Sequence, residues 1–450
     1  PKMLILGLQH MFAMFGATIL VPMLVNSYFK SGNQVLSIQV TLFCAGFGTL
    51  FFHLCSKLKV PAFLGSSFAF LGGFLSIANL KSGIFANMPD SEKLQYACGG
   101  IFVAGLLYLI LALIIKLIGV KRVMRFLPPV VTGPIIICIG LSLAPSAVKN
   151  ASTNWLIAIV ALATIIIFNI WGKGMFKIIP ILMGVVVSYV FALALHFLGF
   201  TNPNGDAIFN FKTVADAAVV GLPPFQLPKF NLTAILVMAP IAIATMMEHI
   251  GDICAISSTT GNNYIKDPGL HRTLVGDGLA TTLASLFGGP ANTTYGENTG
   301  VLALTRVYDP RVIRIAAYFA VAVSFFPIVS VIIGSIPSCI IGGISFVLYG
   351  MISAIGVRNV VENKVDFTKS RNLIVAAVIL VCALGLSSNT VSFAIGSAEI
   401  TLSPLAVASI AGIVLNAVFP GKDYKFDTED VADAVNFEKE VKPKEKKQKK

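Results

Sequence analysis

The sequence predicts an all-α, polytopic membrane protein. Hydrophobic residues make up 56% of the 450 residues, and charged residues make up only 12%. A soluble globular domain carries about twice that share of charge. Apolar stretches of near-bilayer length follow one another along most of the chain. Because a helix satisfies its own backbone hydrogen bonds inside lipid, each stretch is expected to be helical.

Seven segments are expected in the first half of the chain. They are placed at residues 7–25, 35–54, 60–77, 98–117, 127–147, 155–171 and 176–200. The third is short for a full crossing and contains Pro61 and Gly65, so we expect an extended stretch that leads into a half-helix. A polar loop over residues 201–231, rich in Asn, Gly and Pro, separates this half from the next.

Seven further segments are expected in the second half. They are placed at residues 232–255, 272–287, 288–300, 314–333, 339–355, 372–386 and 405–419. The tenth segment overall begins Gly288-Gly289-Pro290 and is again short and interrupted. The tail over residues 420–450 is highly charged and is expected to be a solvated arm.

The two halves share a pattern. Gln9-His10 opens a face of small residues in the first segment, and Glu248-His249 opens a comparable face in the eighth. The interrupted segments take the third place in each half. Corresponding broken helices predict an inverted repeat of seven plus seven segments, with a binding site between the two halves.

The distribution of basic residues predicts the orientation. Seven segments per half put both termini on one side, and 27 of the 33 Lys and Arg residues fall on that side. Cytoplasmic loops are enriched in Lys and Arg. We therefore expect a multi-pass protein of the plasma membrane with both termini cytoplasmic. The net charge of +12 belongs to the loops and the tail, and it gives no reason to expect nucleic acid as a partner.

Two acids stand in the otherwise apolar eighth segment. Glu248 and Asp252 are four residues apart and so share one face of a helix. An acid near the middle of a membrane helix costs about 2.5 to 3.5 kcal/mol on insertion scales. The pair therefore indicates a substrate or proton site of a transporter, with a buried structural network as the alternative.

The interrupted segments supply complementary groups. Half-helices that begin near Ser67 and Glu297 aim free backbone N–H groups at the bilayer midplane, where they suit carbonyl oxygens or an anion. Glu248 and Glu297 can accept ring N–H protons, and Phe68 can stack on a flat ring or simply pack. This combination describes a planar heterocycle such as a nucleobase, although amino acids or bicarbonate could use many of the same groups.

Proton uptake is expected at this site. Burial penalises the charged form of a carboxyl group, so at least one of the three acids should take a proton during transport. His10 and Asp277 either support the site or belong to structural networks between helices. The sequence contains no metal-ligand spacing, nucleophile elbow or Gly-rich phosphate loop. We therefore expect a transporter rather than an enzyme, with no metal or cofactor beyond the coupling ion, a proton or alternatively sodium.

Four stretches of the chain resemble the nucleobase–ascorbate transporter family (nucleobase:cation symporter family 2), and within it the bacterial uracil permeases. They are residues 9–17, 64–70, 267–272 and 292–298, and the signature continues to Arg306. The resemblance implies a core domain and a gate domain, an elevator-like movement of one against the other, and a homodimer. The implied divisions are core 1–118, gate 119–200, external loop 201–231, core 232–335, gate 336–419 and cytoplasmic tail 420–450.

The resemblance also implies roles for individual residues. Glu248 and Glu297 match the positions that hold the base, and Phe68 matches the stacking position. Ala17, Tyr295 and Gly296 match positions that line the site, partly through their main chain. The remaining candidates for proton coupling or for support of the site are His10, Asp252, Asp277 and Asn298.

Residues at two positions indicate different substrates. Uracil permeases have His where this chain has Asp252, whereas purine-transporting members commonly have Asp. Purine members usually have Gln where this chain has Glu297. Because Glu297 is expected to touch the ring, we expect uracil first and xanthine or urate second. A transporter of anions with a related fold is the alternative outside the family, but its site should favour basic or neutral residues.

Overall fold

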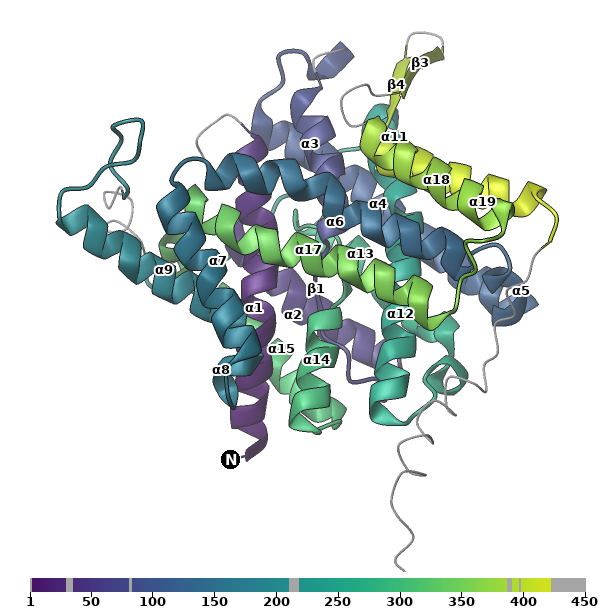
Figure 1. The fold of residues 1–450 in the computed structure, drawn as a ribbon, viewed down its shortest axis with the longest axis horizontal. Helices are drawn as coiled ribbons and strands as arrows, with labels where there is room; N and C mark the ends of the chain where they lie inside the picture. The colour runs from purple at the N-terminus through teal and green to yellow at the C-terminus, as the bar shows by residue number, and fades with distance from the viewer. Residues whose placement is uncertain are drawn as a thin grey trace, which may run out of the picture.

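The structure is a computed structural model that describes residues 2–29, 35–80, 83–209, 218–386, 391–395 and 398–421. The described part is mostly helical (Figure 1). The first half contains α1 (Lys2–Tyr28), α2 (Ile38–Cys55), β1 (Leu64–Ser66), η1 (Phe68–Phe70), α3 (Leu71–Asn79), η2 (Gly83–Phe85), α4 (Asp90–Ile118), α5 (Val120–Met124), α6 (Pro129–Ala151), α7 (Trp155–Ile170), α8 (Met175–Ile178) and α9 (Pro180–Phe197).

The second half repeats the mixture of long helices and short pieces. It contains α11 (Leu232–Met238), η3 (Ala239–Ile241), α12 (Ala242–Thr260), η4 (Ile265–Gly269), α13 (Leu270–Leu286), β2 (Asn292–Thr294), α14 (Gly296–Thr305), α15 (Pro310–Ser324), α16 (Pro327–Gly334), α17 (Ser338–Glu362), α18 (Ser370–Gly385), β3 (Val391–Ile395), β4 (Ala398–Leu402) and α19 (Pro404–Val418).

Local chemistry explains many helix starts. The side chains of Ser37, Asn154 and Ser403 each accept a hydrogen bond from a backbone N–H in the first turn of α2, α7 and α19. Proline stands at the first position of several other helices, where its missing N–H costs nothing. Pro129 and Pro180 begin α6 and α9 in this way.

The helices pack in two main groups. In Figure 1, α6 and α17 run side by side across the front of α1, α12 and α14. Close approach of α6 and α17 depends on Gly140, because a Cβ there would lie 2.2 Å from the carbonyl oxygen of Tyr349. Behind them α4 packs on α13, and α2 packs on both α13 and α15. The division into core and gate domains remains a prediction.

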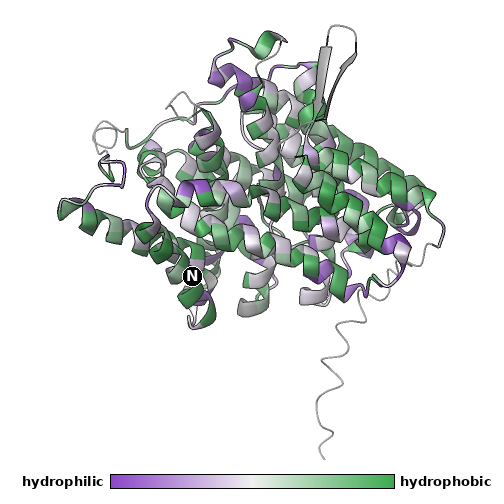
Figure 2. Ribbon diagram, turned by 45° about the horizontal axis from the view of Figure 1, so that its top comes forward, coloured by the Kyte–Doolittle hydropathy of each residue, from purple (hydrophilic) through white to green (hydrophobic). Residues whose placement is uncertain are grey.

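The outer surface is apolar. Figure 2 shows hydrophobic residues along most of the helices, with hydrophilic residues gathered near the connecting loops. Large apolar side chains such as Leu117, Trp171, Phe197 and Val381 are exposed. Exposed apolar surface of this extent is typical of a face that contacts lipid.

Seven helices of the described chain are long and apolar enough to cross a bilayer. They are α1, α2, α4, α6, α9, the continuous run α11–α12 and α17, and the bent pair α15 and α16 would make an eighth. The region of the ninth expected segment contains the continuous helix α13, and those of the remaining ones contain shorter apolar helices or interrupted pieces. The fold class is confirmed as a mostly helical protein with many apolar helices, and the count of fourteen crossings stays a prediction.

Three elements differ from the expected segments. The eleventh segment, expected as one stretch, is bent by 85° between α15 and α16, where Pro327 begins the new helix. The eighth contains a 3-10 turn at Pro240 and continues to Thr260. Between α18 and α19 the chain forms an antiparallel hairpin of β3 and β4, which the apolar pattern did not indicate.

Candidate functional site

The two interrupted segments meet as a short antiparallel ribbon. β1 pairs with β2 so that Gly65 lies opposite Thr293, and backbone hydrogen bonds continue the ladder at both ends. The Ser67 N–H donates to Ala291 at 2.8 Å, and the Tyr295 N–H donates to Phe63 at 2.9 Å. η1 and α3 follow β1, and α14 follows β2. The helix starts expected near Ser67 and Glu297 are therefore confirmed and lie beside one ribbon.

Neighbouring helices satisfy the buried main chain of this ribbon. The hydroxyl of Thr49 on α2 accepts from the Leu64 N–H at 2.9 Å. The Thr281 hydroxyl donates to the Asn292 main-chain carbonyl at 2.6 Å, and the Asn292 side chain in turn donates to the Cys44 carbonyl of α2 at 2.7 Å. Since an unsatisfied backbone group in lipid costs several kcal/mol, these bonds allow non-helical chain at this depth.

Tyr295 fastens the ribbon to α1. Its hydroxyl donates to the Ser66 carbonyl at 3.0 Å and lies 3.3 Å from the hydroxyl of Thr18. The ring fits only because residue 65 is glycine, since a Cβ there would lie 2.3 Å from the tyrosine ring. The Tyr295 side chain is thus part of the framework that holds the ribbon.

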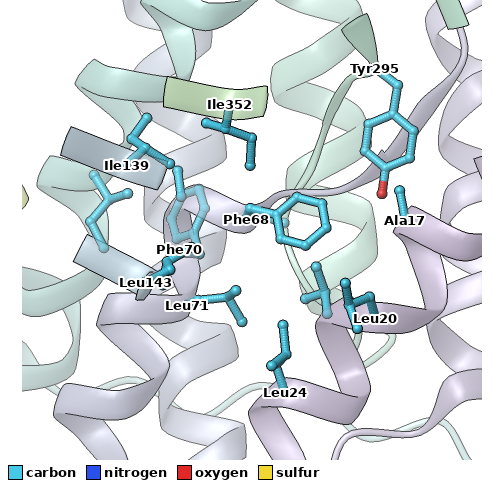
Figure 3. Close-up of a cluster of buried hydrophobic side chains, with 14 of the residues drawn as sticks. Ala17, Leu20, Leu24, Phe68, Phe70, Leu71, Ile139, Leu143, Tyr295 and Ile352 are labelled. Carbon is cyan, nitrogen blue, oxygen red and sulfur yellow. The ribbon is translucent and has the colours of Figure 1, made fainter. Parts of the chain in front are cut away.

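Phe68 stands at the centre of an apolar cluster. In Figure 3 its ring lies between Ile352 and Phe70 on one side and Ala17 and the Tyr295 hydroxyl on the other. Ala17 is fully buried and Phe68 is 8% exposed. The ring of Tyr349 on α17 meets Phe68 edge to face, with ring centroids 6.4 Å apart. Phe68 therefore lies where α1, η1 and α17 come together.

Of the two acids of α12, Asp252 is the one whose contacts reach the start of α14. Glu248 is half-buried and Asp252 is buried, one helical turn apart. The Thr294 hydroxyl donates to Asp252 Oδ2 at 3.0 Å. A Cβ added at Gly296 would lie 3.4 Å from Asp252 Oδ1, so this carboxylate reaches the first residue of α14. The backbone of Glu297 is in the first turn of α14, and its side chain lies outside the described part of the structure.

A buried polar chain extends from Asp252 to α13. Thr294 Oγ1 lies 3.3 Å from His249 Nδ1, and the same ring nitrogen lies 3.3 Å from Asp277 Oδ2. His249 and Asp277 are completely buried, and the hydroxyl of Tyr108 on α4 also faces Asp277. The structure thus joins Asp252 and Asp277, which the sequence analysis treated separately.

His10 and Asn298 form a second buried contact. His10 on α1 lies close to Asn298 on α14, and both are buried. Among the described residues, neither ring nitrogen of His10 has a hydrogen-bond partner with standard geometry. This pair connects α1 to the first turn of α14.

Sequence reasoning missed Thr294 and Tyr108 as parts of the site. A threonine in a Gly/Pro-interrupted stretch is expected to satisfy local main chain, and Tyr108 stands in an ordinary apolar run. Their contacts depend on how α4, α12 and β2 pack together, which no local pattern records.

Comparisons with known proteins show which proteins the whole chain resembles. A family model described as "Permease family" matches residues 1–392. The uracil permease of Bacillus caldolyticus is 40% identical over 432 residues, covering 93% of this chain and 92% of that protein. The uracil permease of Bacillus subtilis is 40% identical over 442 residues, covering 94% of each. The probable uracil permease of Haemophilus influenzae is 39% identical over 428 residues, covering 93% of this chain and 94% of that protein.

Two solved structures have a similar fold. The transmembrane domain of the cyanobacterial bicarbonate transporter BicA has a TM-score of 0.60 at 16% identity, covering 91% of this chain and 96% of that chain. The murine anion transporter Slc26a9, solved in an inward-facing state, has a TM-score of 0.60 at 11% identity, covering 92% and 67%. At these identities the likeness concerns the fold alone.

Proposed function

The chain belongs to the permease family whose model it matches, and from that membership we propose that it transports a nucleobase across the plasma membrane, with uracil as the first candidate. The proposal includes proton coupling and an elevator-type movement of the core domain against the gate domain. It places both termini in the cytoplasm and includes a homodimeric assembly.

The observation that carries the proposal is the shared position of the two helix starts. The β1–β2 ribbon holds η1 and α14 together, and Asp252 reaches the first residue of α14. Free N–H groups at a helix start suit carbonyl oxygens. Phe68 adds an aromatic face in an apolar setting. A flat ring that carries both carbonyl and N–H groups, such as uracil, suits this combination.

Each candidate residue has a proposed role. Glu248 and Glu297 accept the ring N–H groups of the base, and Phe68 stacks on it. Ala17, Tyr295 and Gly296 line the site through small side chains or main chain. The proton is carried by the acids, with Asp252 and Asp277 joined through the Thr294 and His249 contacts and with the His10–Asn298 pair in support.

Uptake of radiolabelled uracil into vesicles tests this function. We expect saturable accumulation that an imposed inward proton gradient drives and that a protonophore abolishes. Replacing sodium with choline should leave the accumulation unchanged. Accumulation that survives the protonophore would exclude proton coupling, and dependence on sodium would identify the other coupling ion.

Xanthine or urate is the second candidate. Asp252 favours it, because purine-transporting members commonly have Asp at this position, and its carboxylate reaches the first residue of α14 here. Unlabelled uracil and xanthine should be compared as competitors against each labelled base. Uracil is expected to compete more strongly, and failure of uracil to compete at all would reverse the order of the candidates.

A further inference from the structure

The predicted cytoplasmic ends of three helices meet in one place. α13 begins there, against the end of α2: a Cβ added at Gly276 would lie 3.2 Å from the Cβ of Cys55. α4 also packs on α13, with Lys116 of its last turn within electrostatic reach of His271 at the start of α13. These ends carry three cations, Lys57, Lys116 and Arg272, and all three lie within electrostatic reach of His271.

The nearest acid is already paired. Asp267 forms an ion pair with Lys59. The Lys59 ammonium, with Lys57 nearby, holds the pKa of the Asp267 carboxyl below its usual range. Among the described residues, no carboxylate forms an ion pair with Lys57, Lys116 or Arg272. All three side chains are exposed.

Helix dipoles explain the positions of only two of these three cations. Lys116 lies in the last turn of α4, and Lys57 follows the end of α2, so each is stabilised by the negative end of a helix dipole. Arg272 instead lies in the first turn of α13, at the positive end of the dipole and near two like charges. The helix dipoles therefore do not explain Arg272, and an anion among the three cations would stabilise it.

The same helix ends also present apolar side chains. Leu54 and Leu117 are 65% and 73% exposed, and Leu58 and Ile118 beside them are also exposed. Lys57 and Leu58 both have left-handed backbone angles, with φ of 54° and 59°. Such angles are unfavourable for residues with a Cβ. The turn after α2 thus exposes Leu58 between Lys57 and Lys59, and its left-handed backbone conformation is energetically unfavourable.

We propose that Lys57, Lys116 and Arg272 bind the phosphate of an anionic phospholipid, whose acyl chains lie along Leu54, Leu58 and Leu117. The three cations lie beside an apolar surface, and this combination favours a lipid over a free phosphate ion. Inorganic phosphate has no apolar part that could contact the leucines. A zwitterionic phospholipid carries a compensating positive charge and should bind weakly. This proposal does not depend on which solute the protein transports.

Lipid binding to the purified full chain tests the proposal. Phosphatidylglycerol, phosphatidylcholine and inorganic phosphate are added separately to delipidated protein in neutral detergent, and bound lipid is counted by native mass spectrometry while the melting temperature is recorded. We expect phosphatidylglycerol alone to remain bound and to raise the melting temperature. Its apparent affinity should fall at least fivefold when salt is raised from 50 to about 500 mM, because salt screens exposed charges.

The variant K57Q/K116Q/R272Q should bind phosphatidylglycerol at least tenfold more weakly. The matched control K173Q/K177Q/K364Q removes the same charge from exposed positions on the same predicted face and should bind like the parent chain. Equal weakening in both variants would overturn the site and indicate a general effect of net charge. An equal rise in melting temperature with inorganic phosphate would overturn the lipid assignment. The salt series on the unaltered protein tests the proposal even if a variant fails to fold.

Discussion

Gly65 and Tyr295 illustrate how one absent side chain shapes the proposed site. The glycine lies in β1, and the tyrosine ring from the other strand's end occupies the space where a Cβ would stand. The ring in turn brings its hydroxyl to Ser66 and Thr18. The resemblance placed Tyr295 at the site, but the sequence could not show that its side chain would serve the framework, because the partner lies 230 residues away in the chain.

Gly65→Ala is expected to destabilise the protein by about 1 to 3 kcal/mol through overpacking and to reduce uptake strongly. Gly72→Ala is the matched control, because a Cβ at position 72 in α3 meets nothing within 4 Å. Melting temperature and initial uptake rate should be measured for both. A Gly65→Ala protein that melts and transports like the parent would show that the ring can move aside.

Thr294→Val should weaken transport because it removes the hydroxyl that donates to Asp252. A buried carboxylate that loses a donor costs about 1 to 3 kcal/mol. Thr294→Ser keeps the donor and should restore most of the activity. Uptake with and without an imposed proton gradient is the informative measurement, since the Thr294→Val protein should gain less from the gradient than the Thr294→Ser protein does. An equal gain in both variants would separate Thr294 from proton coupling.

At the scale of elements, the sequence predicted where the two segments are interrupted. It did not predict that the two interruptions pair with each other. Pro61 and the Gly288-Gly289-Pro290 run each predict a break in a helix, and the helices that follow begin where expected. The antiparallel pairing of the two breaks could not be predicted, because each strand is three residues long and its register depends on α2 and α13. The eleventh segment shows the same limit, since Pro327 permits a bend but does not set its angle.

The half-helix α3 ends on a buried cation. Lys93 on α4 donates from Nζ to the carbonyls of Ala78 and Leu80 at 3.1 and 2.9 Å. These carbonyls belong to the end of α3, where helix carbonyls lack partners and the dipole is negative. Lys93 therefore helps to fix the helix that continues from Phe68.

Lys93→Met is expected to lower stability by about 1 to 3 kcal/mol, because two buried carbonyls lose their donor, and to raise the KM for uracil more than it lowers the maximal rate. Lys93→Arg should recover much of both. Lys229→Met serves as a control, since Lys229 is a surface cation that pairs with Glu92 and should matter little. Equal behaviour of the Lys93 and Lys229 variants would contradict the role of Lys93.

At the scale of the whole molecule, the sequence predicted the class and the order of the helices, because apolar length is a local property. The grouping of helices into two moving bodies is a property of tertiary packing and stays a prediction. One contact across the predicted boundary is close enough to test it. A Cβ added at Gly16 on α1 would lie 3.3 Å from the Cβ of Ile181 on α9.

The double variant Gly16→Cys/Ile181→Cys should form a disulfide after a shift of a few tenths of an ångström, since Cβ atoms of disulfides are about 3.5 to 4.5 Å apart. If the core moves against the gate, oxidation should stop uptake and a reductant should restore it. Gly133→Cys/Val360→Cys is the control, because a Cβ at Gly133 would lie 3.6 Å from that of Val360 and both positions belong to the predicted gate. Full uptake by the oxidised first variant would argue against the elevator movement.

The ribbon that β1 and β2 form restricts the routes by which a solute can reach the proposed site. Separating the two half-helices would break main-chain hydrogen bonds such as those from Ser67 to Ala291 and from Tyr295 to Phe63, and each backbone group left unsatisfied away from water costs several kcal/mol. A solute path that opens beside the ribbon, with both half-helices still paired, avoids this cost.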